Sequence, residues 1–132
     1  RPFRLIGAPW LDGRRLAGKL NSLRLPGVLF RAAWFKPSAS KFTGEECSGV
    51  EIHVTDTRSY RSVTAAVALI CAVRRQHPVE FKFRERSFDR LAGTGALRKA
   101  IESGRTHAEI AASWRKGLAD FLERREPYLL YR

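Results

Sequence analysis

Methionine is missing from this sequence of 132 residues, even at the first position. A chain without an initiator residue is expected to be an excised piece of a longer protein. Cysteine is scarce as well, since only Cys47 and Cys71 occur. Two cysteines make no disulfide framework, and no CxxC pair or Cys/His cluster predicts a zinc site. We expect both thiols to be free and buried.

Long apolar runs are also absent. The longest, residues 63–73, is broken by Thr64 and falls short of the roughly 18 residues that span a bilayer. Residues 1–7 enter a strand-like pattern at once and lack the apolar segment of a signal peptide. No Gly-rich phosphate-binding motif occurs. What remains is an ordinary globular composition, 44% hydrophobic and 29% charged, in a chain whose length favours a single domain.

Acidic residues are few: 13 Asp and Glu stand against 25 Lys and Arg, and the net charge is +12. A basic excess of this size is typical of proteins that bind anionic surfaces or nucleic acid. Residues 42–57, however, carry four acidic and no basic side chains, and no nucleic-acid-binding motif is present. We therefore disfavour nucleic acid, and keep as the alternative function a non-catalytic basic module that binds anionic cell-wall polymer or nucleic acid.

Periodicity along the chain predicts an α+β fold in which helices pack on a small mixed β-sheet. Asp12 can cap a helix over residues 13–23, and residues 63–75 are apolar almost all round, as in a buried helix. Residues 28–36 are apolar on both sides and predict the central strand, with residues 49–56 beside it. Further elements are expected as short strands at 3–6, 81–83 and 128–131, a helix after Thr94, and a long helix that Thr106 and Glu109 cap and whose stripe begins at Ile110 and Trp114.

The stretch 38–56 joins a polar loop to a cleanly alternating strand. Val50, Ile52 and Val54 share one face, which we expect to be buried, and this places His53 on the polar face. The polar face and the loop are then expected to meet at one rim. Because binding groups gather on loops that a rigid sheet holds, this rim is the predicted site for a small polar ligand.

Short motifs in the same stretch, with others along the chain, resemble a known bacterial family. They are Ser40-Lys41-Phe42, Gly44, Cys47, Gly49-Val50 and residues 52–56, with further matches within residues 1–10, 21–28, 35–37, 88–98 and 125–131. In order and spacing they are similar to the exo-β-N-acetylmuramidases, a family first catalogued as a domain of unknown function.

The resemblance implies a C-terminal auxiliary domain of a larger two-domain glycoside hydrolase. Its N-terminal Rossmann-like domain would hold the catalytic carboxylates and is absent here, so the isolated chain is expected to be inactive. Members release N-acetylmuramic acid from the non-reducing end of peptidoglycan fragments. The expected partners are therefore that N-terminal domain and a muramyl saccharide. The resemblance also implies an exported protein, periplasmic or extracellular, and no metal or organic cofactor.

Each candidate side chain has a structural reading beside the functional one. His53 can bond a sugar hydroxyl or a carboxylate, or it can simply bond the loop. Lys41 can meet the lactyl carboxylate of muramic acid, or it can pair with a neighbouring glutamate. Trp34 and Trp114 occupy predicted core positions, so Trp10 is the better candidate for a cleft.

Carboxylates near the loop, Glu45, Glu46, Glu51 and Asp56, are too loosely specified to assign the acid and base of a glycosidase. We assign no catalytic residue and no metal ligand to this chain. The predicted substrate-binding residues are Ser40, Lys41, Glu45, Cys47, His53 and Trp10.

Overall fold

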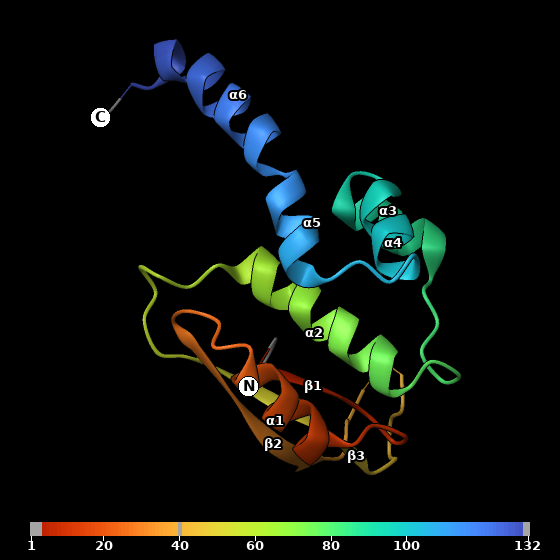
Figure 1. The fold of residues 1–132 in the computed structure, drawn as a ribbon. Coiled ribbons are helices and arrows are strands. Elements are labelled where there is room, and N and C mark those ends of the chain that lie inside the picture. The colour runs from red at the N-terminus through yellow and green to blue at the C-terminus, as the bar shows by residue number, and fades with distance from the viewer. Residues whose placement is uncertain (1–3, 40, 131–132) are drawn as a thin grey trace. The chain divides into compact units, whose positions relative to one another are not determined.

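A computed structural model describes residues 4–39 and 41–130 of the chain. In chain order the elements are β1 (Leu5–Ala8), α1 (Gly13–Ser22), β2 (Val28–Phe35), β3 (Cys47–Val54), α2 (Ser62–Gln76), α3 (Glu85–Ala92), α4 (Ala96–Glu102), α5 (His107–Ser113), α6 (Arg115–Arg125) and the short 3₁₀ turn η1 (Glu126–Tyr128) (Figure 1). The α+β class is confirmed. The chain divides into two compact units, residues 1–83 and 84–132, so the single domain expected from its length stays a prediction.

The sheet of the first unit has the order β1-β3-β2, and β3 pairs antiparallel with both neighbours. Val50 of β3 lies opposite Ile6 of β1 and Ala32 of β2. The predicted mixed sheet is therefore wrong, because both pairings are antiparallel. The predicted central position of residues 28–36 is wrong as well, since β3 is central and β2 forms an edge.

The apolar composition of β2 misled the prediction because the strand is covered on one face only. Leu29 and Trp34 are 54% and 60% exposed. Along the free edge, the Asn21 side-chain amide donates to the Phe30 carbonyl at 2.8 Å and accepts from the Phe30 N–H at 2.9 Å. A side chain of α1 thus takes the place of a further strand at this point and protects the edge.

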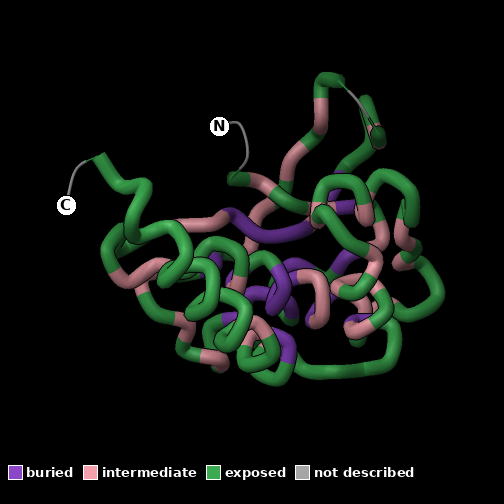
Figure 2. The backbone as a smooth tube through the Cα atoms, turned by 90° about the horizontal axis from the view of Figure 1, so that it is seen from above, coloured by how far each residue is buried: buried purple, intermediate pink, exposed green. Residues whose placement is uncertain are grey.

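Helices α1 and α2 pack on one face of the sheet (Figure 1). Leu16 and Leu20 of α1 and Ala68 of α2 meet the strand residues Phe30 and Val50 in one buried cluster. The buried stretches, purple in Figure 2, gather in this part of the molecule. Hydrophobic burial against the helices therefore fixes which face of β3 is inside.

The predicted burial of β3 holds only in part. Val50 is fully buried, whereas Val54 at the end of the strand is exposed, and Glu51 on the other face is only 8% exposed. The predicted strand at 81–83 is absent, since that segment has no regular structure. No helix of residues 4–39 and 41–130 has the length and apolar character needed to cross a membrane.

Helix starts follow local hydrogen bonds. The Asp12 carboxylate accepts from the Arg15 N–H at 3.0 Å and caps α1 as predicted. In the second unit Thr106 and Glu109 form the predicted capping box at α5. Both caps satisfy backbone N–H groups that a helix leaves unpaired at its first turn.

The second unit, residues 84–132, consists of short helices. The Arg98 side chain bonds Asp89 of α3 at 2.9 Å and Glu102 of its own helix at 3.1 Å, and the Arg98 hydrogen bonds hold the pKa of the Asp89 carboxyl below its usual range. The single long helix predicted after Thr106 is interrupted at Trp114, where α5 ends and α6 begins. The predicted strand 128–131 is wrong in its described part, because η1 occupies the chain up to Tyr128 and no strand follows through Leu130; residue 131 lies outside the described residues.

Two glycines allow close backbone contacts around β3, Gly13 with helix α1 and Gly49 with strand β1. A Cβ on Gly13 would collide with the backbone of Gly49 in β3, and a Cβ on Gly49 would collide with the backbone of β1 at Ile6 and Gly7. The hydroxyl of Ser48 accepts from the Gly13 N–H at 3.1 Å. The helix therefore approaches the middle strand at a distance that only glycine permits.

We predict that Gly13→Ala lowers the free energy of unfolding by about 1–3 kcal/mol, because the added methyl must push helix and strand apart. The matched control is Gly18→Ala in the exposed part of the same helix, where nothing lies within 4 Å. That change should raise stability by about 0.5–1 kcal/mol, since alanine is the better helix former. Urea unfolding followed by circular dichroism measures both. If Gly13→Ala stabilised the fold as much as Gly18→Ala does, the close approach of α1 to β3 would be contradicted.

Candidate functional site

The loop between β2 and β3 is closed by its own backbone. Gly44 N–H donates to the Pro37 carbonyl and Glu45 N–H to the Phe42 carbonyl, both at 3.0 Å. Phe42 has φ of 65°, in the left-handed region, which costs a bulky residue about 1–3 kcal/mol. Its ring packs against the buried cluster of the sheet and helices, and this packing offsets the strain.

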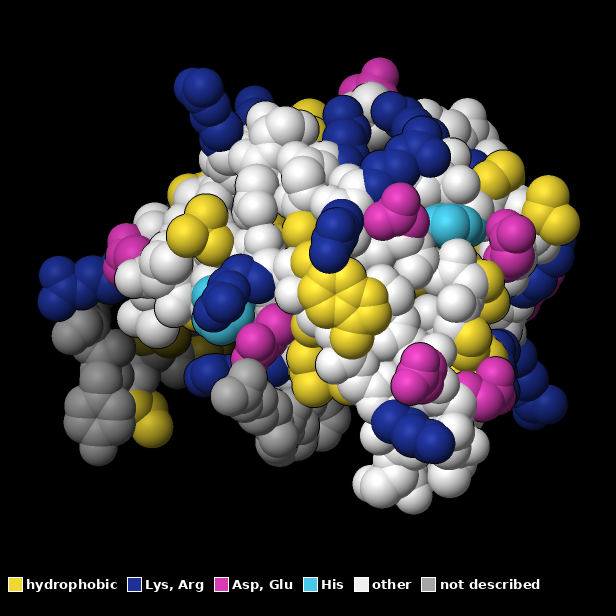
Figure 3. Space-filling model, turned by 90° about the horizontal axis from the view of Figure 1, so that it is seen from below, with side chains coloured by type: hydrophobic (Ala, Val, Ile, Leu, Met, Phe, Trp, Pro, Cys, Tyr) yellow, Lys and Arg dark blue, Asp and Glu magenta, His cyan; other side chains and the backbone are white. Residues whose placement is uncertain are grey.

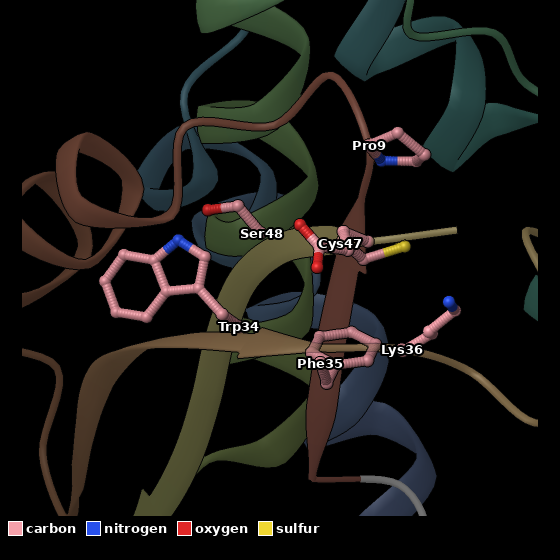
Figure 4. Close-up of a pocket in the computed structure, with 7 residues that line it drawn as sticks. Pro9, Trp34, Phe35, Lys36, Cys47 and Ser48 are labelled. Atoms are coloured by element: carbon pink, nitrogen blue, oxygen red, sulfur yellow. The ribbon is translucent and has the colours of Figure 1, made fainter. Parts of the chain in front are cut away.

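A hollow of about 400 Å³ opens where this loop enters β3 (Figure 4). We call it the Trp34 hollow. Residues from the β1–α1 turn, the end of β2 and the start of β3 line it, as Figure 4 shows: Pro9, Trp34, Phe35, Lys36, Glu46, Cys47 and Ser48.

The Trp34 indole is the largest exposed feature of this hollow. The guanidinium carbon of Arg14 lies 5.3 Å from the ring centroid, so α1 supplies a cation that holds the indole in place. Lys36 and Glu46 add one charge of each sign. The hollow thus offers a flat apolar surface, the Trp34 indole, next to the charged side chains of Lys36 and Glu46, which can form hydrogen bonds. This arrangement suits a polar ligand that has one apolar face.

Cys47 is 2% exposed, and its sulfur points away from the Trp34 indole (Figure 4). Burial, with a smaller contribution from the Glu45 carboxylate, raises the pKa of the Cys47 thiol. The thiol therefore stays protonated at neutral pH and is a poor nucleophile. Neither cysteine is part of a disulfide, as expected, but only Cys47 is fully buried, since Cys71 is half-buried.

A second hollow of about 360 Å³, the Trp10 hollow, lies beside the β1–α1 turn. Trp10 packs against the His77 ring with centroids 5.3 Å apart, and His77 Nε2 accepts from the Asp12 N–H at 3.3 Å. Lys41 Nζ lies 4.7 Å from the centroid of the Phe42 ring. The lining residues include Ile6, Trp10, Lys41, Phe42, Leu69, Glu80, Phe81 and Lys82.

Of the predicted site residues, the structure brings Trp10 and Lys41 into the Trp10 hollow and Cys47 into the Trp34 hollow. Glu45 is exposed on the β2–β3 loop and lines neither hollow, and Ser40 lies outside the described residues. Within the described part of the loop, no ion pair joins Lys41 to Glu45 or Glu46, so the structural reading of Lys41 as half of a surface pair is not supported.

His53 does not join this group. It lies six positions after Cys47, about 20 Å along an extended strand, so the expectation of one shared rim is wrong for His53. Its Nε2 lies 3.2 Å from the Glu51 carboxylate, within ion-pair distance but outside hydrogen-bond geometry. The contact is with Glu51 of the same strand and not with the loop that the structural reading named, and a role of His53 in binding stays a prediction.

Sequence reasoning missed Trp34, which it placed in the core, and Phe81 with Lys82, which it placed on a strand. Arg31 in the middle of β2 was the available signal, because a charged residue within an apolar strand is typical of an edge. Trp114 is half-buried in the second unit. Within residues 4–39 and 41–130, no group of three His, Cys, Asp or Glu side chains has the geometry to hold a metal ion.

The chain is similar to known proteins along its whole length. The family described as "Exo-beta-N-acetylmuramidase NamZ, C-terminal" matches residues 1–131. Peptidoglycan beta-N-acetylmuramidase NamZ of Bacillus subtilis (strain 168) is 42% identical over 132 residues, which cover 99% of this chain and 32% of that protein. A crystal structure of a DUF1343 family protein from Bacteroides fragilis NCTC 9343 matches with a TM-score of 0.88 at 28% identity, over 99% of this chain and 36% of the other. The chain spans about a third of the length of each relative.

We predict that Cys47 reacts slowly with iodoacetamide in the folded chain, because reaction needs both access and a thiolate. In a Cys71→Ser variant at pH 8, alkylation should be at least about tenfold slower than in guanidinium, where burial no longer protects the thiol. Mass spectrometry measures the rate. The matching Cys47→Ser variant, which keeps the half-buried Cys71, should react faster; an order reversed between the two variants would contradict the burial of Cys47.

Proposed function

The chain belongs to the family of C-terminal domains of the exo-β-N-acetylmuramidase NamZ, and from this premise we propose that it is the C-terminal part of a peptidoglycan-degrading glycoside hydrolase. The match over residues 1–131 carries the proposal and bears out the family resemblance of the sequence motifs. The Bacillus subtilis relative is a peptidoglycan beta-N-acetylmuramidase. The proposed reaction is release of terminal N-acetylmuramic acid from peptidoglycan fragments.

In this proposal the chain forms one wall of the substrate cleft at the end of the sheet that bears the two hollows. The Trp34 indole offers a face on which the C–H side of a sugar ring can stack. Lys36 and Glu46 beside it can bond ring substituents. Directed polar groups around an apolar surface support a saccharide as the ligand.

The Trp10 hollow supplies positive charge to the same wall. Lys41 and Lys82 line it together with one carboxylate, Glu80, so cations outnumber anions two to one and an anionic substituent such as the lactyl carboxylate of muramic acid can pair with an ammonium group there. The proposed wall then includes Ser40, Lys41, Glu45, Cys47 and Trp10, with Trp34 added. His53, at the other end of β3, is left with its neighbour Glu51.

The acid and base of the reaction are proposed to come from an N-terminal Rossmann-like domain. A glycosidase needs one carboxyl group that stays protonated, which requires a raised pKa. The pKa of Asp56 is shifted in the opposite direction, because the Ser59 hydroxyl donates to its carboxylate at 2.6 Å and lowers the pKa. The proposal needs no metal or organic cofactor. It also places the enzyme outside the cytoplasm, in the periplasm or beyond, where peptidoglycan lies.

The alternative of a basic binding module rests on the net charge of +12. On the face drawn in Figure 3, Lys and Arg side chains are interspersed with acidic and apolar ones. A polyanion site usually gathers positive charge into one continuous patch. The mixed distribution on this face favours the saccharide wall over the polyanion module.

In the full-length enzyme we predict that Trp34→Ala lowers kcat/KM by about tenfold, equivalent to about 1.4 kcal/mol, with little change in Tm. The indole is exposed, so its loss removes a stacking surface rather than core packing. The matched control is Leu29→Ala, an exposed apolar residue at the other end of the same strand. Hydrolysis of a chromogenic muramide measures kcat/KM. Unchanged kinetics in a stably folded Trp34→Ala enzyme would remove this hollow from the cleft.

The isolated 132-residue chain should release no muramic acid from the same substrate, because the proposed catalytic carboxylates belong to the missing part. It should also be washed from DNA or anionic wall polymer at physiological salt, since counterion release no longer favours weak polyanion binding there. Turnover by the isolated chain would overturn the placement of the catalytic groups. Micromolar retention on the polymers without turnover would instead support the basic module.

A further inference from the structure

Helix α6 of the second unit carries an apolar stripe that is about half exposed. Leu118, Phe121 and Leu122 recur at helical spacing and are 56%, 52% and 41% exposed. At about 100° per residue these three side chains share one face, and Lys116, Asp120 and Glu123 lie on the opposite face. The helix itself has no buried residue. A short helix of this kind is stable in water only when its apolar face is packed.

We propose that this α6 stripe, Leu118, Phe121 and Leu122, is the docking surface for the N-terminal domain that the relatives carry ahead of the matching region. The inference rests on the proposed function, which supplies that domain. The chain spans only 32% and 36% of the two relatives, so about two thirds of each lies outside the match. The occupant is thus a segment covalently joined to this chain.

The small size of the stripe favours a covalently joined occupant. Three half-exposed side chains offer only a few hundred Å², since a whole aromatic side chain buries roughly 150–250 Å². A stable complex of separate proteins needs about 800 Å² on each partner. A tethered domain needs less, because the linker holds it at an effective concentration that reaches the millimolar range.

A second copy of the chain is disfavoured by charge. Arg115 and Arg125 stand at the two ends of α6. If two α6 helices paired antiparallel through the stripe, Arg115 of one would meet Arg125 of the other at both ends. In a parallel pair, each arginine would lie beside the same arginine of the other copy. Like charges brought together at an interface oppose association, whereas a different domain can supply acidic or neutral neighbours.

Hydrogen–deuterium exchange of the peptide covering residues 115–125 tests the docking, in the 132-residue chain and in the full-length protein. Docking should slow exchange of this peptide at least about tenfold in the full-length protein relative to the chain alone. In full-length protein, Leu118→Asn/Phe121→Asn should abolish that difference. The matched control Lys116→Gln/Glu123→Gln, on the opposite face, should keep it.

Several outcomes would overturn the docking proposal. One is equal exchange of the peptide in both proteins. Another is slow exchange in the chain alone, which would depend on concentration if a second copy covers the stripe, or on added anionic vesicles if a membrane does. Hydrogen exchange is measured independently of turnover. An inactive full-length protein in which α6 is protected would therefore contradict the proposed function and support the docking. An active full-length protein in which α6 is not protected would support the proposed function and contradict the docking.

Discussion

The packing of the first turn of α1 directly onto the backbone of β3 is the contact on which the rest of the first unit depends. It is possible because Gly13 has no side chain, since a Cβ there would collide with the backbone of Gly49. The Ser48 hydroxyl, accepting from the Gly13 N–H, holds the two backbones in register. At this separation Leu16 reaches Val50 in the buried cluster. Any larger residue at the contact would lift the helix away from the apolar face that it covers.

The same contact arranges the candidate site. The first turn of α1 carries Arg14, whose guanidinium lies over the Trp34 ring, so the helix that covers the sheet also orients the exposed indole. The loop that leads into β3 keeps Phe42 in a strained conformation because its ring is packed against the cluster. Strain of this kind persists only where the surroundings impose it, and it is frequent at binding sites. Core packing and the shape of the two hollows are therefore linked.

A wall of this kind can recognise a substrate without performing the chemistry. Its thiol is kept neutral by burial, and Asp56 is kept ionised by its hydrogen bonds. Neither state suits a nucleophile or a general acid. Under the proposed function, this chain supplies the recognition wall and a separate domain supplies the acid and base. The proposed docking of that domain would give the apolar stripe on α6 a role, because two domains that share a cleft must be held in place.

The sequence by itself determined the features that depend on near neighbours. The cap of Asp12 on α1 and the box of Thr106 with Glu109 join groups within three residues of each other, so the spacing alone predicts them. The buried helix α2 followed from its apolar composition, and the α+β class and family followed from the order of such elements and motifs. The two helix caps are formed within short segments and do not depend on the rest of the chain.

The tertiary structure alone decided which strand is central, which side of β2 is open and which candidates share a site. Pairing of β3 with both β1 and β2 joins residues far apart in sequence, and period-two alternation does not specify which edge stays free. That pairing leaves Trp34 exposed and removes His53 from the loop. Alternation fixes the face to which a side chain points, but the position along the strand and the neighbours across it depend on long-range contacts.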